Sequence, residues 1–238
     1  MPQLHQVEAL TFDVFGTVVD WRTSVTSEVA AVASARKVQG NWHSFADEWR
    51  RGYRDGMDLV NKGKKPWRTV DVIHREKLDE LLPKYGLGNL NEDQRRQLNL
   101  VWHRLEPWAD AVEGLNRLRR RFVVATLSNG NMRLLTDMAK HAGLPWDCIL
   151  SSELAGAFKP DPRAYRKAAE LLAVPTERVM MTAAHSSDLR AAASTGMRTA
   201  FVARPLEYGP NGETEVVPGG TFDVVATDFL DLARKLDC

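Results

Sequence analysis

The chain has 238 residues, which is long for one minimal domain and short for two independent ones. Its composition, 44% hydrophobic and 26% charged, is typical of globular proteins and excludes disordered, collagen-like and coiled-coil classes. The 32 basic and 31 acidic side chains give a net charge of +1, so no general electrostatic attraction to nucleic acid or anionic membrane is expected.

The cysteine content and the hydrophobic pattern narrow the class further. Cys148 and Cys238 are too few for a disulfide scaffold or a cysteine zinc site. No apolar run approaches the roughly 18 residues that a membrane span needs. Residues 1–6 are polar and lack the basic-then-apolar order of a signal peptide. We therefore expect a cytoplasmic protein with neither nucleic-acid nor membrane partners.

The first half of the chain begins with one strand and continues with helices. Residues 9–12 are an apolar stretch that runs into Asp13 and the turn residues Gly16 and Thr17, which predicts a buried strand ending in a turn. No strand candidate lies between residues 22 and 105. The expected helices in that block are residues 23–37, 41–60, 70–82 and 91–105, the last with Asn91 as its N-cap.

In the second half, apolar strands alternate with amphipathic helices. The expected strands are residues 122–129, 148–152, 178–184, 199–204 and 222–226, and the expected helices are 111–120, 132–142, 164–172, 189–195 and 230–235. This alternation predicts an α/β fold, a Rossmann-like doubly wound parallel sheet with helices on both faces. We expect residues 1–20 and 106–238 to form this core domain and residues 21–105 to form an inserted helical cap domain.

Polar residues follow three of the predicted strands. Asp13, Ser128, Asn129 and Asp188 fall near the carboxyl ends of strands, where open α/β sheets bind their ligands. We expect these side chains to converge. Asp13 could serve as a carboxylate nucleophile, which forms a covalent ester or acyl-phosphate. Taken alone, it fits equally well as a turn or helix-capping carboxylate.

Four short motifs in this order resemble the haloacid dehalogenase superfamily. They are DVFGT at residues 13–17, TLSNG with Ser128, AFKPDPRAY with Lys159, and AAHSSD with Asp188. Each motif alone is weak, whereas the ordered set is specific and spans the whole chain, including the position of the cap. The resemblance implies a Rossmann-like core with an inserted cap and an enzyme that uses Asp13 as nucleophile.

The residue two positions after Asp13 separates the chemistries of this superfamily. Its phosphatases carry a second aspartate there, whereas this sequence has Phe15, whose ring neither transfers a proton nor binds magnesium. Of the acidic side chains that could bind magnesium, only Asp13 and Asp188 remain, because position 187 is a serine and not an acidic residue. We therefore expect neither a metal nor another cofactor.

The motif forms resemble the type II (S)-2-haloacid dehalogenases, with D-x-[YF]-G-T, S-N-G and K-P-D-x-R-x-Y. The resemblance implies that Lys159 and Asp188 act in catalysis and that Arg50, which follows Trp49 in the cap, binds the leaving halide. Arg51 and Arg54 are alternatives to Arg50, and a solvated helix face is the alternative for the whole cluster. The implied substrate contacts are Phe15, Gly16, Thr17, Arg50, Ser128, Asn129 and Tyr165.

The fourth motif departs from the common S-x-N-x-x-D form, because Ala183, His185 and Asp188 stand at its three defined positions. His185 either positions or deprotonates water, since histidine titrates near neutral pH, or it is a structural loop residue; both interpretations stay open. A subgroup of these dehalogenases has the form A-A-H-x-x-D, and some of its members accept fluoroacetate.

The resemblance thus implies a hydrolase acting on carbon–halide bonds of short 2-haloalkanoic acids, namely haloacetates including fluoroacetate, and L-2-halopropionate. The product would be a 2-hydroxy acid, formed through an aspartyl ester. Two alternatives are a magnesium-dependent phosphohydrolase or phosphonatase of the same superfamily and a catalytically silent binding protein. The sequence leaves the preferred halogen and the oligomeric state open, with a homodimer as one alternative.

Overall fold

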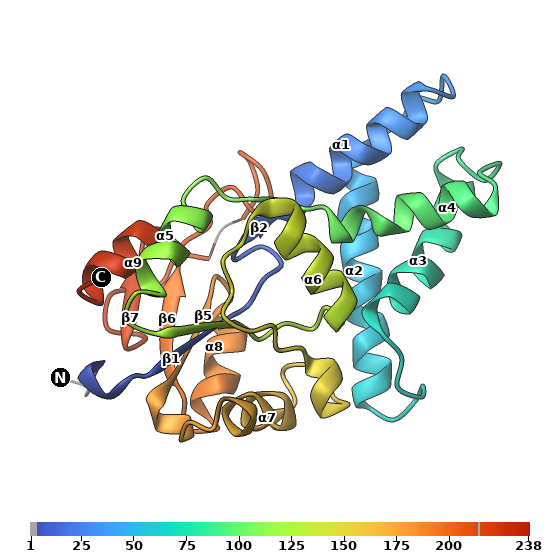
Figure 1. The fold of residues 1–238 in the computed structure, drawn as a ribbon. Coiled ribbons are helices and arrows are strands. Elements are labelled where there is room, and N and C mark those ends of the chain that lie inside the picture. The colour runs from blue at the N-terminus through green and yellow to red at the C-terminus, as the bar shows by residue number, and fades with distance from the viewer. Residues whose placement is uncertain (1–3, 214) are drawn as a thin grey trace.

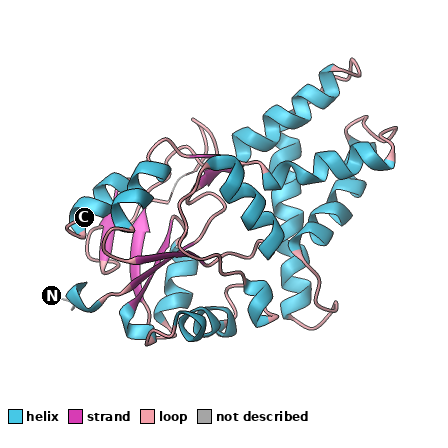
Figure 2. Ribbon diagram, viewed as in Figure 1, coloured by secondary structure: helices cyan, strands magenta, loops and turns pink. Residues whose placement is uncertain are grey.

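A five-stranded, fully parallel sheet forms the centre of the molecule (Figures 1 and 2). The computed structural model describes residues 4–213 and 215–238. The strands, in sheet order, are β4 (Val123–Thr126), β1 (Ala9–Phe12), β5 (Val179–Ala183), β6 (Arg198–Val202) and β7 (Val224–Ala226). Phe12 at the end of β1 pairs with Thr126 of β4 and Thr182 of β5, so Asp13 leaves the sheet between two other strands.

Helices cover both faces of this sheet, as predicted. One face carries α5 (Ala111–Leu118), α6 (Met132–Ala142) and α9 (Phe229–Lys235), and the other carries α7 (Pro162–Leu172) and α8 (Ser186–Ala193). Alternation along β1 explains the two layers, because Leu10 and Phe12 join one buried cluster and Ala9 joins the other. The doubly wound α/β fold is confirmed.

The predicted insertion between the first strand and the rest of the core is helical (Figure 1). It contains α1 (Trp21–Ser34), α2 (Trp42–Asn61), α3 (Val70–Lys84), α4 (Glu92–Asn99) and the 3-10 turn Leu100–His103. Asn91 caps α4 through a capping box with Gln94. β2 (Val19–Asp20) and β3 (Glu106–Pro107) form a short antiparallel ladder. It pairs the segment that leads into the helical insertion with the segment that leads out of it, next to the predicted domain boundaries.

Several element predictions need correction. The expected strand 122–129 ends at Thr126, and the expected helix 23–37 is observed as Trp21–Ser34. The expected strand at residues 148–152 is wrong: only isolated bridges form there, because the Leu150 N–H donates to the Thr126 hydroxyl instead of a backbone carbonyl. The expected helix 189–195 begins earlier, at Ser186, which places Asp188 in the first turn of α8. The expected helix 91–105 ends at Asn99 and tightens into a 3-10 turn.

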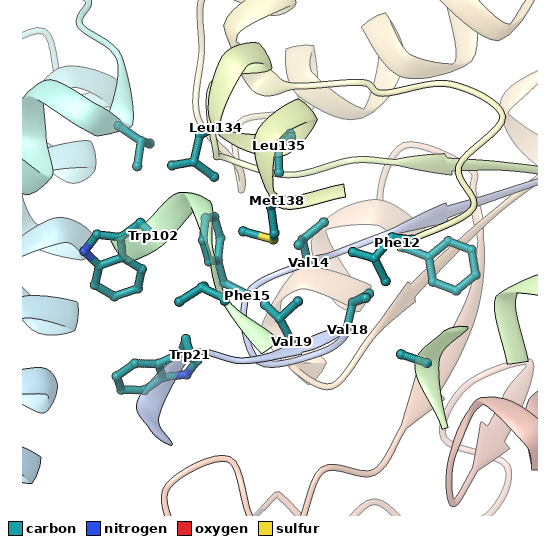
Figure 3. Close-up of a cluster of buried hydrophobic side chains, with 14 of the residues drawn as sticks. Phe12, Val14, Phe15, Val18, Val19, Trp21, Trp102, Leu134, Leu135 and Met138 are labelled. Carbon is teal, nitrogen blue, oxygen red and sulfur yellow. The ribbon is translucent and has the colours of Figure 1, made fainter. Parts of the chain in front are cut away.

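Aromatic side chains join the core to the cap (Figure 3). The Phe15 ring lies 6.0 Å from the Trp102 ring, and Trp21 stacks on Trp102 at 6.3 Å. All three side chains are buried, so the loop after β1 is packed against the cap rather than exposed. None of the helices in the described residues has the length and apolar character needed to cross a membrane.

Candidate active site

A cavity of about 360 Å³ lies between α2 of the cap and the carboxyl end of the sheet. Seven residues predicted from sequence line it: Asp13, Phe15, Arg50, Asn129, Lys159, His185 and Asp188. The structure thus brings together groups from the loop after β1, the cap helix α2, the loop after β4, and the start of α8. Four other predicted residues, Gly16, Thr17, Ser128 and Tyr165, do not line it.

Lys159 joins the two predicted catalytic carboxylates. Its Nζ lies 3.1 Å from Asp13 Oδ1 and 2.6 Å from Asp188 Oδ2. The Tyr165 hydroxyl, which is fully buried, donates to the second oxygen of Asp188. Burial alone would lower the pKa of Lys159, but Asp13 and Asp188 outweigh it and raise that pKa above its ordinary value. Lys159 is therefore a cation at neutral pH, held between the two carboxyl groups.

The second oxygen of Asp13 has two partners. Thr17 donates to Oδ2 at 2.8 Å, and His185 Nδ1 lies 3.2 Å from the same atom. Burial alone would raise the pKa of Asp13, yet Lys159 and His185 hold it far below the ordinary range. Asp13 is thus fully ionised at neutral pH. The Thr17 hydroxyl also accepts the Ala184 N–H at 2.9 Å, which fixes Thr17 behind Asp13 rather than in the cavity.

His185 has a second carboxylate partner, Glu207, that sequence reasoning missed. The distance between His185 Nε2 and Glu207 Oε2 is 3.0 Å, and Trp21 Nε1 donates to Glu207 Oε1 at 3.0 Å. Burial alone would lower the pKa of His185, but Asp13 and Glu207 raise it to about 10. Glu207 follows β6, so its position beyond a strand's carboxyl end was the signal that could have identified it.

Gly16 provides the space in which Glu207 lies. Its φ is +89°, and a Cβ at this position would come within 2.2 Å of the Glu207 carboxylate. Its N–H donates to the Val19 carbonyl at 3.1 Å, so this amide is already paired. The structure therefore gives Gly16 a close-approach role beneath the site in addition to its place in the turn.

Arg50, from α2, is buried in an aromatic cage. Its guanidinium lies 4.9 Å from the ring centre of Tyr53 and 5.4 Å from those of Phe15 and Trp21. One nitrogen, Nη2, donates to the Phe15 carbonyl at 3.4 Å, while Nε and Nη1 have no hydrogen-bond partner among the described residues. A buried cation with unpaired donors is a site that an anion would stabilise.

The two alternative arginines are arranged differently. Arg54 also lines the cavity, and its Nη2 donates to the Tyr208 hydroxyl at 3.0 Å, across the gap between the cap and the core. Arg51 is exposed and is not among the lining residues. Of the three arginines, Arg50 is the one that combines burial, a place in the cavity wall and unpaired donors, as an anion-binding group would.

The SNG motif supports the cavity wall more than it lines it. The Ser128 side chain is fully buried, and its hydroxyl accepts the Gly130 N–H at 3.2 Å, so it does not reach the cavity. The Asn129 amide both accepts the Lys159 N–H at 2.7 Å and donates to the Lys159 carbonyl at 3.2 Å. Asn129 thus fixes the backbone that carries the Lys159 ammonium.

The site does not present the oxygen-rich ligand set that magnesium prefers. Asp13 and Asp188 share the Lys159 ammonium, and the side chain two residues after Asp13 is the phenyl ring of Phe15. Across residues 4–213 and 215–238, no group of three or more His, Cys, Asp or Glu side chains is arranged to hold a metal ion.

Comparison with known proteins identifies the class to which this fold and site belong. The family model for haloacid dehalogenase-like hydrolases matches residues 7–196, and the chain belongs to that family. Among solved structures, it is similar to the defluorinating L-2-haloacid dehalogenase Rha0230, with a TM-score of 0.94, 43% identity, and 98% and 96% of the two chains covered.

Two further similar proteins are also 2-haloacid dehalogenases. The L-2-haloacid dehalogenase PA0810 superposes with a TM-score of 0.91 at 43% identity, over 97% of this chain and 99% of that one. The (S)-2-haloacid dehalogenase H-109 of Pseudomonas putida is 28% identical over 204 residues, which is 84% of this chain and 88% of the relative.

Proposed function

We propose that the chain is a hydrolase that removes halide from short (S)-2-haloalkanoic acids and haloacetates. One observation carries the proposal: an ionised, buried Asp13 and the partly unpaired guanidinium of Arg50 line the same small cavity. A nucleophile and an anion-stabilising cation in one cavity are what displacement of a halide from carbon requires. The similarity to L-2-haloacid dehalogenases supports the same assignment.

In the first step, the Asp13 carboxylate attacks the substrate Cα from the side opposite the halogen. The new C–O bond makes an aspartyl ester, the carbon–halogen bond breaks, and the halide leaves with its electron pair toward Arg50. Configuration therefore inverts at a chiral carbon. Lys159 keeps Asp13 ionised by its positive charge. Desolvation by the aromatic cage strengthens the attraction between Arg50 and the halide.

In the second step, water attacks the Asp13 carbonyl carbon and releases the 2-hydroxy acid. We propose that Asp188, which is linked to Asp13 through Lys159, and His185, which contacts Asp13 Oδ2, orient that water. Tyr165 and Thr17 hold Asp188 and Asp13 in place. We further propose residues 1–20 with 106–238 as the core domain and 21–105 as the cap domain, because α2 of the cap supplies Arg50.

A direct assay distinguishes the proposed dehalogenase from a magnesium-dependent phosphohydrolase. Halide release from chloro-, bromo- and fluoroacetate and from both enantiomers of 2-chloropropionate is measured by ion chromatography, beside phosphate release from phosphate esters, with and without EDTA. We expect halide release from haloacetates and the L enantiomer, unchanged by EDTA. Phosphate release that stops with EDTA and returns with Mg²⁺ would contradict the proposal.

The ester intermediate has a separate test. In a single turnover in H₂¹⁸O, the oxygen that enters the product comes from the original Asp13 carboxylate, so we expect unlabelled 2-hydroxy acid and ¹⁸O in Asp13. Label in the first-turnover product would mean that water attacks Cα directly.

A further inference from the structure

Glu207 is a buried carboxylate held in one position by three neighbours. His185 Nε2 and Trp21 Nε1 contact its carboxylate oxygens at 3.0 Å, and the missing side chain of Gly16 leaves the space that it fills. Its side chain is 3% exposed. Burial alone would raise the pKa of Glu207, but His185 outweighs it and lowers that pKa, so the group is ionised at neutral pH.

An ionised carboxylate only accepts hydrogen bonds, so Glu207 fixes the proton pattern of His185. Nε2 must carry a hydrogen, and Nδ1 is left facing Asp13 Oδ2 at 3.2 Å. While Asp13 is an anion, Nδ1 also donates and the ring is an imidazolium. Once Asp13 becomes an ester, one of the two anions that hold His185 charged is gone. Nδ1 can then lose its proton while Glu207 retains the hydrogen on Nε2.

We propose that Glu207 is a positioning residue of the ester-hydrolysing step, acting through His185; this inference rests on the proposed dehalogenase function. Glu207 selects the neutral tautomer whose Nδ1 lone pair points at the ester, which is the form able to take a proton from water. Among the described residues it makes no hydrogen bond with Asp13, and its hydrogen-bonded link to Asp13 runs through the His185 imidazole.

The proton balance of this step closes. After ester formation, His185 releases one proton to solvent. The water oxygen then bonds to Asp13 Cγ as one of its protons passes to Nδ1. The hydroxyl proton of the tetrahedral carbon passes to the departing alkoxide as the ester C–O bond breaks, which gives the 2-hydroxy acid. Asp13 returns as a carboxylate beside an imidazolium, and one proton and one halide leave per turnover.

The test is rapid-quench kinetics on Glu207→Gln, in which the amide keeps the size of the side chain and removes its charge. We expect a burst of halide followed by a steady state slower by ~10- to 100-fold, with the alkylated peptide containing Asp13 accumulating in the mass spectrum. The matched control is Glu213→Gln in the same loop, an exposed carboxylate that we expect to leave both steps unchanged.

A double-mutant cycle with His185→Asn separates positioning from a general structural role. If Glu207 acts through His185, Glu207→Gln should add no further loss in the His185→Asn background. Full additivity of the two losses would overturn the proposal. So would equal loss of ester formation and ester hydrolysis in Glu207→Gln, or an unchanged steady state without adduct.

Two further results keep the outcome clear. Should Glu207→Gln fail to fold, Glu207→Asp keeps the charge but is one methylene shorter; we expect it to show the same burst, and wild-type kinetics would overturn the inference. Failure of the proposed function looks different, because the wild-type protein itself would then release no halide from any haloacid.

Discussion

Among the described residues, His185 and His103 each lie between two carboxylates, and His185 lines the cavity of the candidate active site. His185 contacts Asp13 and Glu207, whereas His103 contacts Asp71 and Asp137, each at 3.0 Å. In both cases, burial alone would lower the pKa of the ring and the carboxylates outweigh it, so that the pKa is raised. Local chemistry alone therefore does not distinguish a catalytic site from a structural one.

The surroundings of the two rings make the difference. Asp71 of α3 also accepts from Asn131, and Asp137 of α6 also accepts from Arg133, so each carboxylate around His103 has a second hydrogen-bond partner. Around His185, Asp13, Arg50 and the ring itself line one cavity, and two buried nitrogens of Arg50 have no hydrogen-bond partner among the described residues. We propose that the cavity, rather than the carboxylate–imidazole arrangement, distinguishes the candidate active site.

The largest expected effect on the rate of halide release comes from neutralising Asp13, the carboxylate partner of His185, and neutralising a carboxylate partner of His103 is its control. Asp13→Asn should abolish halide release, because a neutral amide is a poor nucleophile. Asp137→Asn, beside His103, should leave the rate of halide release unchanged. Ion chromatography checks both, with the mutant mass verified, since deamidation would regenerate Asp13. An Asp13→Asn protein with more than a tenth of the wild-type rate would remove Asp13 from the mechanism.

The next effect concerns the rings themselves. His185→Asn should slow ester hydrolysis by ~10²-fold or more and leave ester formation less affected, because the group that accepts a proton from water is lost. A halide burst and an adduct on the peptide containing Asp13 are the readouts. His103→Asn should show neither. If both variants turn over normally without adduct, His185 is as structural as His103.

Much of the fold could be predicted from the sequence because the patterns are locally strong. The helix at residues 132–142 was predicted with its observed bounds, since its apolar stripe ends at Gly143, which has a left-handed φ of +64°. The strand at 148–152 failed because the Leu150 N–H donates to the Thr126 side chain instead of a backbone carbonyl. No local pattern reveals that a hydroxyl from another segment will take a hydrogen bond of the ladder.

The candidate site divides in the same way. Asp13, Lys159 and Asp188 belong to ordered motifs, and the structure brings them within hydrogen-bonding distance of one another through Lys159. Glu207 and the cage around Arg50 depend on contacts between segments far apart in the chain, such as Trp21 with Glu207. Such contacts follow from the packed structure, so a motif search that ended at Asp188 missed them.

The smallest expected effect is the change in the free energy of unfolding when His103 is replaced. The direction in which this change varies with pH tests whether the ring of His103 is charged, as inferred for His185. Because its pKa is raised in the folded protein, the charged ring stabilises the fold fully below its unfolded pKa of about 6.5. That contribution is lost as pH rises through the folded pKa. His103→Asn should therefore lower the free energy of unfolding by ~1–3 kcal/mol near pH 6 and by less near pH 9.5. Urea unfolding at both pH values measures the difference.

The matched control is His141→Asn, which removes an exposed contact with Glu106. We expect this variant to change the free energy of unfolding by less than ~1 kcal/mol at either pH, because exposed ion pairs contribute little. A His103→Asn protein whose loss grows toward pH 9.5 would mean that the neutral ring is the stabilising form. The inference that a charged His103 links Asp71 of α3 to Asp137 of α6 would then be wrong. A carboxylate pair around a buried imidazole could then not be taken as evidence of a charged ring at His185 either.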